Sequence, residues 1–245
     1  MHLLLINPNT TSAITDLMLT EARRIAAPTT RVSAVTGRFG ARYVATRAAY
    51  AIAGHAALDA YAVHGSDADV VVLACFGDPA LLALKEIAHQ PVIGMAEASC
   101  LTATAGGGRF SIVTGGERWR PMLEEFVALI GLGSHLASVE TVAPTGADIA
   151  RDPDRALGLL ADACNAAVTL HRADSVILAG AGLVGLAARI ADRVPVPLID
   201  SLAASVRMAE ELTGKGNHKS RTGEFAMPAG VETVGLSAAL AEKLG

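Results

Sequence analysis

An internal repeat is the feature that most constrains the fold of this 245-residue chain. Residues 68–77 read ADVVVLACFG and align without gaps to residues 173–182, ADSVILAGAG, with six of the ten positions identical. This offset of 105 residues continues with small changes, because residues 91–98 match residues 197–204 at an offset of 106, and residues 3–9 match residues 110–116 at 107. Self-similarity of this extent predicts two α/β halves of similar structure.

Short apolar runs alternate with segments of helical period along the whole chain, a pattern typical of βα units built around parallel sheets. The runs predict strands near residues 2–6, 31–35, 69–74, 91–95, 109–114, 137–142, 174–179 and 196–199. We therefore expect an α/β fold with two pseudo-symmetric lobes, each a parallel-type sheet flanked by helices, and an active site in the cleft between them. Residues 1–97 and 208–245 are predicted to form the first lobe, residues 98–207 the second, and the polar segment 213–225 an exposed loop.

Composition favours an enzyme for small molecules. The net charge is −4 and no stripe of basic residues is present, which argues against nucleic-acid binding. The N-terminus has only a short apolar run, and the alanine-rich tract at residues 48–65 is interrupted by His55, Asp59 and His64. Neither segment is long enough to be read as a secretory signal or a membrane span, so the tract predicts a core helix and the protein is expected to be cytoplasmic.

The three cysteines form an odd set without the spacing of metal ligands, at residues 75, 100 and 164. This pattern predicts a reduced protein without disulfides or a cysteine metal site, in which any functional cysteine acts through its thiol. Cys100 and Cys164 fall in predicted helices and are interpreted as packing residues.

Ligands of parallel sheets bind beyond the carboxyl ends of the strands, so matching strand ends of two facing halves should line one cleft. The repeat places Cys75 opposite Gly180, and Asn7 corresponds to Thr114. The residues expected at the cleft are Asn7, Pro8, Asn9, Thr10, Cys75, Phe76, Gly77, Asp78, Glu97, Ala98, Ser99, Thr114, Gly115, Gly116, Gly180, Ala181 and Gly182.

Cys75 is the first catalytic candidate. Asp78 and Pro79 resemble the N-cap and first residue of a helix, and a thiol just ahead of a helix N-terminus should have a lowered pKa. None of the seven histidines lies in a predicted strand-end loop, so a thiolate that removes a proton directly fits better than a Cys–His nucleophile. Inert packing, the common role of a lone cysteine, is the alternative.

Deprotonation next to a carbonyl also needs groups that stabilise the enolate oxygen. The backbone amides of Phe76, Gly77, Ala181 and Gly182 are candidates, and tight turns are the alternative reason for the glycines. Helix capping is the alternative for several polar positions that could contact substrate. The positions proposed to contact substrate are Asn7, Pro8, Asn9, Thr10, Glu97, Ser99 and Thr114.

Taken together, the motifs INPNT, ACFGDPAL, PVIGMAEAS, FSIVTGG, PLIDSLAASVRMAEEL and RYVATRAAYAIAGHAALDAY resemble the hydantoin and allantoin racemase branch of the Asp/Glu/hydantoin racemase superfamily, over essentially the whole chain. The resemblance implies a cofactor-independent isomerase that forms a homo-oligomer and acts on a small molecule. In such racemases one cysteine removes the α-proton as a thiolate, and a second cysteine on the opposite face returns a proton. Cys75 matches the first, but Gly180 stands at the position of the second.

This departure leaves three interpretations open, because a glycine cannot donate a proton. The leading interpretation is a racemase, natural or a laboratory variant, slowed by loss of an acid that typically contributes about 10² to 10⁴-fold, or helped by water in the vacated space. The second is a one-cysteine lyase that decarboxylates malonate-like acids, as arylmalonate decarboxylases of the superfamily do with the cysteine of the other half. The third is a protein that only binds the ligand.

Overall fold

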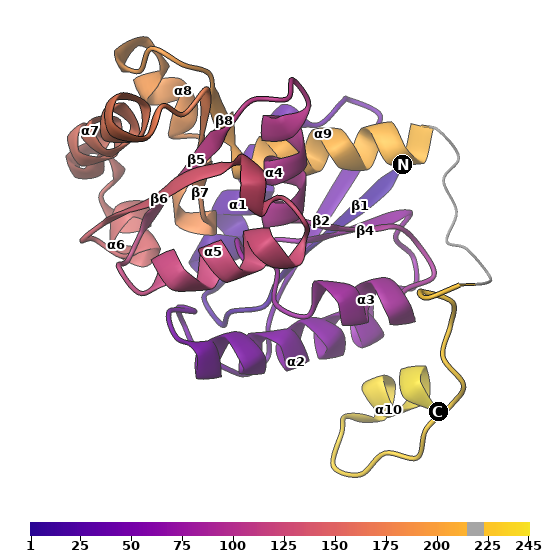
Figure 1. The fold of residues 1–245 in the computed structure, drawn as a ribbon. Coiled ribbons are helices and arrows are strands. Elements are labelled where there is room, and N and C mark those ends of the chain that lie inside the picture. The colour runs from indigo at the N-terminus through magenta and orange to yellow at the C-terminus, as the bar shows by residue number, and fades with distance from the viewer. Residues whose placement is uncertain (215–222) are drawn as a thin grey trace.

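The computed structural model describes residues 1–214 and 223–245 and contains two four-stranded parallel sheets surrounded by helices (Figure 1). All eight predicted strands are present within one or two residues of their expected bounds. Of the predicted polar loop at 213–225, residues 215–222 lie outside the described part of the chain. The α/β prediction is confirmed.

The first half builds a sheet with the strand order β2-β1-β3-β4. Its elements are β1 (His2–Asn7), α1 (Ser12–Ile25), β2 (Arg31–Thr36), α2 (Arg47–His64), β3 (Val70–Leu73), α3 (Leu81–Ile87), β4 (Val92–Gly94) and α4 (Met95–Thr104). All four residues of β3 are buried, as expected for a central parallel strand covered on both faces.

The second half repeats this arrangement, with the strand order β6-β5-β7-β8. Its elements are β5 (Phe110–Gly115), α5 (Trp119–Leu129), β6 (Leu136–Val142), α6 (Gly146–Arg151), α7 (Pro153–His171), β7 (Ser175–Ala179), α8 (Ala187–Ile190), β8 (Leu198–Asp200) and α9 (Ser201–Gly214), with short 3₁₀ turns η1 (Gly133–His135), η2 (Ala181–Leu183) and η3 (Ala191–Arg193). Helix α10 (Ala238–Leu244) follows and packs on α2. Each strand takes the same place in its sheet as its repeat partner, so the predicted duplication is confirmed.

The alanine-rich tract forms α2, which Thr46 caps by accepting a hydrogen bond from the Ala49 amide. Small side chains on its buried side, including Ala53, Ala57 and Ala60, let the helix approach the first sheet closely. No helix within residues 1–214 and 223–245 is long and apolar enough to cross a membrane.

Helices α4 and α9 join the two halves. They lie side by side, and α4 contacts β7 and β8 while α9 contacts β3 and β4 (Figure 1). One core cluster therefore runs through both lobes, from Leu3 and Val72 to Ile112 and Ile177. The predicted lobe boundaries, 97/98 and 207/208, fall inside these two helices and stay a prediction.

A carboxylate caps the start of each of these helices. In the second half, Asp200 Oδ1 accepts from the backbone amides of Leu202 and Ala203, both at 3.0 Å. Asp200 Oδ2 accepts from the amide of Gly185, at 2.6 Å, in the loop after β7. The carboxylate thus ties the strand-end loop to the helix that follows β8.

In the first half, the carboxylate that caps the helix comes from a different position in the repeat. Asp78, in the loop after β3, accepts from the amides of Ala96 and Glu97 at 2.9 and 2.8 Å. The prediction that Asp78 caps its own following helix is wrong, because α3 begins only at Leu81, after Ala80. Asp78 has a φ of +52°, and its carboxylate contacts α4 instead.

Gly94 leaves room for the Asp78 carboxylate at the start of α4. It is the repeat partner of Asp200, and a Cβ atom placed on it would lie 2.0 Å from Asp78 Oδ2. The Asp78 carboxylate thus fills the space that a side chain at residue 94 would need. Any larger residue at 94 must displace a fully buried group.

We expect Gly94→Ala to lower the free energy of unfolding by about 1–3 kcal/mol, the usual cost of overpacking a buried site. Urea unfolding monitored by circular dichroism measures this change. Gly158→Ala is the matched control, because Gly158 lies in α7 with nothing within 4 Å of its Cβ position. This control should gain about 0.5–1 kcal/mol from helix propensity. Equal stability of the two variants would contradict the assignment.

Candidate active site between the lobes

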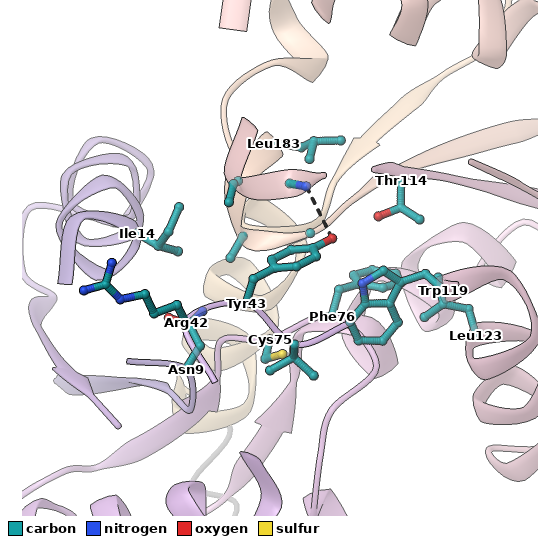
Figure 2. Close-up of a pocket in the computed structure, with 16 residues that line it drawn as sticks. Asn9, Ile14, Arg42, Tyr43, Cys75, Phe76, Thr114, Trp119, Leu123 and Leu183 are labelled. Carbon is teal, nitrogen blue, oxygen red and sulfur yellow. Dashed lines mark hydrogen bonds between the residues drawn. The ribbon is translucent and has the colours of Figure 1, made fainter. Parts of the chain in front are cut away.

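A cavity lies between the lobes where the carboxyl ends of both sheets meet (Figure 2). The first lobe contributes Asn9, Ile14, Arg42, Tyr43, Val44, Cys75 and Phe76, and the second contributes Thr114, Trp119, Leu123, Gly146, Ala147, Gly180, Ala181, Gly182 and Leu183. Its volume of about 50 Å³ admits several waters but is small for a ligand site. We therefore expect the walls to move apart when a substrate binds.

Seven of the predicted site residues line this cavity. Cys75 follows β3 and Gly180 follows β7, so the two positions paired by the repeat meet at one site, as predicted. Cys75 is 7% exposed. The seven are Asn9, Cys75, Phe76, Thr114, Gly180, Ala181 and Gly182.

The predicted role of Asn7 at the cavity wall is wrong, because this side chain is fully buried beneath the wall. Its amide nitrogen Nδ2 donates to Asn9 Oδ1 at 3.1 Å and to Thr15 Oγ1 at 2.9 Å. Asn9 Oδ1 also accepts from the amide of Thr11. Asn9 is thereby fixed in place, and its own Nδ2 has no acceptor among the described residues.

Glu97 and Ser99 do not reach the cavity either, because β4 runs directly into α4 without a loop. Glu97 forms an ion pair with Lys85, and Ser99 donates to the carbonyl of Met95 inside the helix. Helix capping was the alternative interpretation of both residues, and Glu97 does accept from the Gly94 amide, at 3.4 Å. The other predicted positions that lie off the cavity wall are Pro8, Thr10, Gly77, Asp78, Ala98, Gly115 and Gly116.

The electrostatics of Cys75 differ from the prediction. Burial and, to a smaller extent, the nearby Asp78 charge raise the pKa of the Cys75 thiol to about 12. The expected lowering by a helix N-terminus is wrong, because α3 begins at Leu81, beyond the turn that contains Asp78 and Ala80. In this closed conformation Cys75 is a thiol, able to donate a proton but needing ionisation before it can accept one.

Asp78 lies directly behind the cysteine. Its backbone amide donates to the Cys75 carbonyl at 2.9 Å. Burial raises the pKa of Asp78 to about 8, although the hydrogen bonds from Ala96 and Glu97 favour the charged form. The loop that carries the thiol is thus clamped to α4 through one buried carboxylate.

The predicted oxyanion donors are backbone amides in the loops after β3 and β7, and their role stays a prediction. The amides of Phe76, Gly77, Ala181 and Gly182 have no acceptor within the described residues, and all except Gly77 belong to cavity-lining residues. Gly77 has a φ of +104°, and a Cβ there would lie 2.9 Å from the Trp119 ring. This position therefore needs glycine for the ring to pack against the loop.

Gly180 occupies a backbone conformation that side chains avoid. Its φ of +117° and ψ of 147° lie near a region used almost only by glycine. A Cβ would have space, at 3.6 Å from Thr114 Oγ1 and 3.8 Å from Leu183 Cδ1. The Thr114 hydroxyl itself donates to the Ala179 carbonyl at 2.9 Å. Space for a second thiol is present, but the backbone at residue 180 disfavours one.

Sequence reasoning missed the cavity residues in the loop after β2 and at the start of α6, and it missed Trp119 at the start of α5. Tyr43 reaches across the cleft, where its hydroxyl donates to the Gly115 carbonyl at 3.0 Å and accepts from the Gly146 amide at 3.3 Å (Figure 2). Burial raises the pKa of this phenol. Tyr43 in the RYV stretch and Trp119, the one tryptophan of the sequence, could have been considered as site residues. Neither lies in a segment where the two halves of the repeat align.

The described residues contain no group of three or more His, Cys, Asp or Glu side chains that could hold a metal ion. No histidine lines the cavity in the described part of the chain. Its exchangeable protons belong to thiol, phenol, alcohol, amide, indole and guanidinium groups.

Comparison with known proteins gives consistent results. The family model described as Asp/Glu/Hydantoin racemase matches residues 3–209. A hydantoin racemase of Paenarthrobacter aurescens is 34% identical over 93% of this chain and 98% of its own. The allantoin racemase structure from Klebsiella pneumoniae superposes with a TM-score of 0.92 at 32% identity, covering 98% of both chains. Arylmalonate decarboxylase, at a TM-score of 0.63 and 19% identity, shares the fold.

We expect Asp78→Asn to make Cys75 more reactive, because the substitution removes a neighbouring negative charge that raises the thiol pKa. Mass spectrometry of the Cys75 peptide should show alkylation by iodoacetamide several-fold faster at mildly alkaline pH. Asp200→Asn is the matched control, since it weakens the equivalent cap in the other lobe at a similar cost of about 1–3 kcal/mol. An identical alkylation profile in both variants would show that Asp78 does not act on the thiol.

Proposed function

The chain belongs to the Asp/Glu/hydantoin racemase family, and from that premise we propose that it racemises a five-membered ureide ring of the hydantoin or allantoin type. It is an isomerase, like the hydantoin and allantoin racemases that match nearly its whole length. The observation that carries the proposal is Cys75 at the wall of a cavity between the lobes, next to free backbone amides.

The cavity wall indicates which substituent the ring carries. Most of it is apolar, and polar side chains come only from Asn9, Arg42, Tyr43 and Thr114 among its described residues. Such a wall suits a flat polar ring with an apolar group on the stereogenic carbon. We therefore expect hydantoins with apolar substituents to react faster than allantoin, whose ureido substituent is polar. The apolar side chains are Ile14, Val44, Phe76, Trp119, Leu123 and Leu183.

The chemistry begins with removal of the ring proton next to a carbonyl. The Cys75 thiolate takes this proton, and the carbonyl becomes an enolate. We expect the amides of Phe76, Ala181 and Gly182 to donate to the enolate oxygen, since they belong to cavity-lining residues and have no acceptor among the described residues. Oxyanion donors of this kind are each worth about 10² to 10³-fold in rate.

A second candidate function follows from Cys75 being a thiol beside a glycine at residue 180. Decarboxylation of a malonate-like acid needs one proton donor on one face, which the Cys75 thiol provides. Arg42, exposed at the cavity rim, offers a cation for a carboxylate. The products distinguish the two reactions, because the lyase releases carbon dioxide and the racemase does not.

The test uses single enantiomers of a 5-substituted hydantoin in D₂O. We expect exchange of the C5 proton together with loss of optical activity, and a fall of about 10² to 10⁴-fold in Cys75→Ser, because a positioned acid–base group is removed. Cys164→Ser, which removes a thiol buried in α7 away from the cavity, should retain the parental rate.

Other outcomes would replace the proposal. Release of carbon dioxide from disubstituted malonates, without hydantoin turnover, would support the lyase. Calorimetric binding of hydantoin that persists in Cys75→Ser, with no turnover by the parent, would indicate a binding protein.

We also expect kcat/KM to rise with pH, because Cys75 has to lose a proton whose pKa lies near 12. Between about pH 6 and about pH 8 the rise should approach tenfold per pH unit, since the thiolate fraction grows in that proportion well below the pKa. Polarimetry at a series of pH values measures it. A plateau within this range would show that the thiolate is already formed in the open enzyme.

A further inference from the structure

We infer that Tyr43 is the catalytic acid on the ring face opposite Cys75, where Gly180 supplies no proton. The inference rests on the proposed racemase function and adds a residue to it. It starts from a chemical requirement, because inversion at carbon needs removal of a proton on one face and delivery on the other.

The hydroxyl of Tyr43 belongs spatially to the second lobe, although the residue comes from the first. Its oxygen is held by the Gly115 carbonyl at 3.0 Å and the Gly146 amide at 3.3 Å. Figure 2 shows the ring extending between Cys75 and Leu183, with the hydroxyl directed away from the Cys75 sulfur. The phenol proton is therefore held by backbone of the second lobe, whereas the Cys75 thiol belongs to the first.

The Tyr43 hydroxyl and Gly180 are linked by a shared neighbour, Leu183. Leu183 Cδ1 lies 3.8 Å from the Cβ position of Gly180 and 3.9 Å from that of Gly146, so one side chain borders both residues. Tyr43 Oη lies 3.8 Å from that same Cβ position of Gly146. The phenol thus approaches the wall where a second thiol would stand.

The other proton carriers of the wall are less suitable. The Thr114 hydroxyl donates to a backbone carbonyl, as the Tyr43 hydroxyl does, but it is an alcohol and therefore a much weaker acid than a phenol. Arg42 is exposed at the rim, and its guanidinium does not release a proton in this pH range. Tyr43 combines an acidity between those of an alcohol and a thiol with a half-buried position at the cavity wall.

Inversion takes place in two proton transfers. The Cys75 thiolate forms an S–H bond as the ring C–H bond breaks, and the electron pair moves into the enolate. The Tyr43 O–H bond then breaks as a new C–H bond forms on the opposite face, which leaves a phenolate. The Gly146 amide, which already donates to this oxygen, stabilises the phenolate. The reverse turnover, with phenolate as base and thiol as acid, or proton exchange with water, restores the starting state.

A purely structural role for Tyr43 makes a different prediction. If the phenol only joins the lobes, its loss should impair every reaction of the closed site in proportion. If it is the acid, its loss should separate proton exchange from inversion. The two enantiomers of the substrate distinguish these cases, because only one presents its proton to Cys75.

The experiment compares Tyr43→Phe with the parent, using each enantiomer of a 5-substituted hydantoin in D₂O. We expect racemisation to fall by about 10² to 10⁴-fold. One enantiomer should still exchange its C5 proton with retention of configuration, and the other should become inert. Tyr50→Phe is the matched control, because it removes a similar half-buried phenol whose hydroxyl donates to the Gly77 carbonyl at 2.5 Å outside the cavity wall. Its ratio of inversion to exchange should equal that of the parent.

A second variant covers the case in which Tyr43→Phe does not fold. Difluorotyrosine at residue 43 keeps the ring and its hydrogen bonds but has a more acidic phenol, so the pH profile of racemisation should move to lower pH. The same replacement at residue 50 should not move it.

Two results would overturn the inference. They are an unchanged inversion-to-exchange ratio in Tyr43→Phe, whether or not both reactions slow in proportion, and a pH profile that does not respond to difluorotyrosine. Absence of exchange and racemisation in the parent would instead remove the proposed function itself, and this inference with it.

Discussion

The packing of α4 against α9 is the contact on which the rest of the molecule depends. Each helix follows the last strand of its own sheet and packs on strands of the other, so the apolar core is shared between the lobes. Because carboxylates cap these helices, the buried Asp78 and the half-buried Asp200, the same contacts hold the loops after β3 and β7. The shape of the cavity is therefore a consequence of how the lobes are joined.

Burial sets the chemistry of this site. A sulfur in a small, mostly apolar cavity holds its proton strongly, and a charged neighbour such as Asp78 strengthens that preference. The same removal from water strengthens hydrogen bonds from backbone amides to an enolate. The low fraction of thiolate slows proton removal, whereas stronger hydrogen bonds to the enolate speed it, so burial has two opposite effects on the rate.

The repeat made the architecture predictable, because buried parallel strands leave continuous apolar runs such as residues 70–73 that align between the halves. The same logic located Cys75, Thr114 and Gly180. It failed for Asp78, where a local Asp-Pro signal predicted a cap of the next helix, while the carboxylate caps a helix that begins at Met95. Tyr43 lay beyond prediction, since the direction of a side chain from the long loop after β2 depends on the opposite lobe.

The backbone of Gly180 bears on how this protein can evolve. A single codon change can write cysteine at residue 180, but a side chain there enters a conformation that costs on the order of 1–3 kcal/mol unless the loop also rearranges. A thiol introduced at residue 180 therefore trades stability for a second proton carrier, unless the loop after β7 changes its path at the same time.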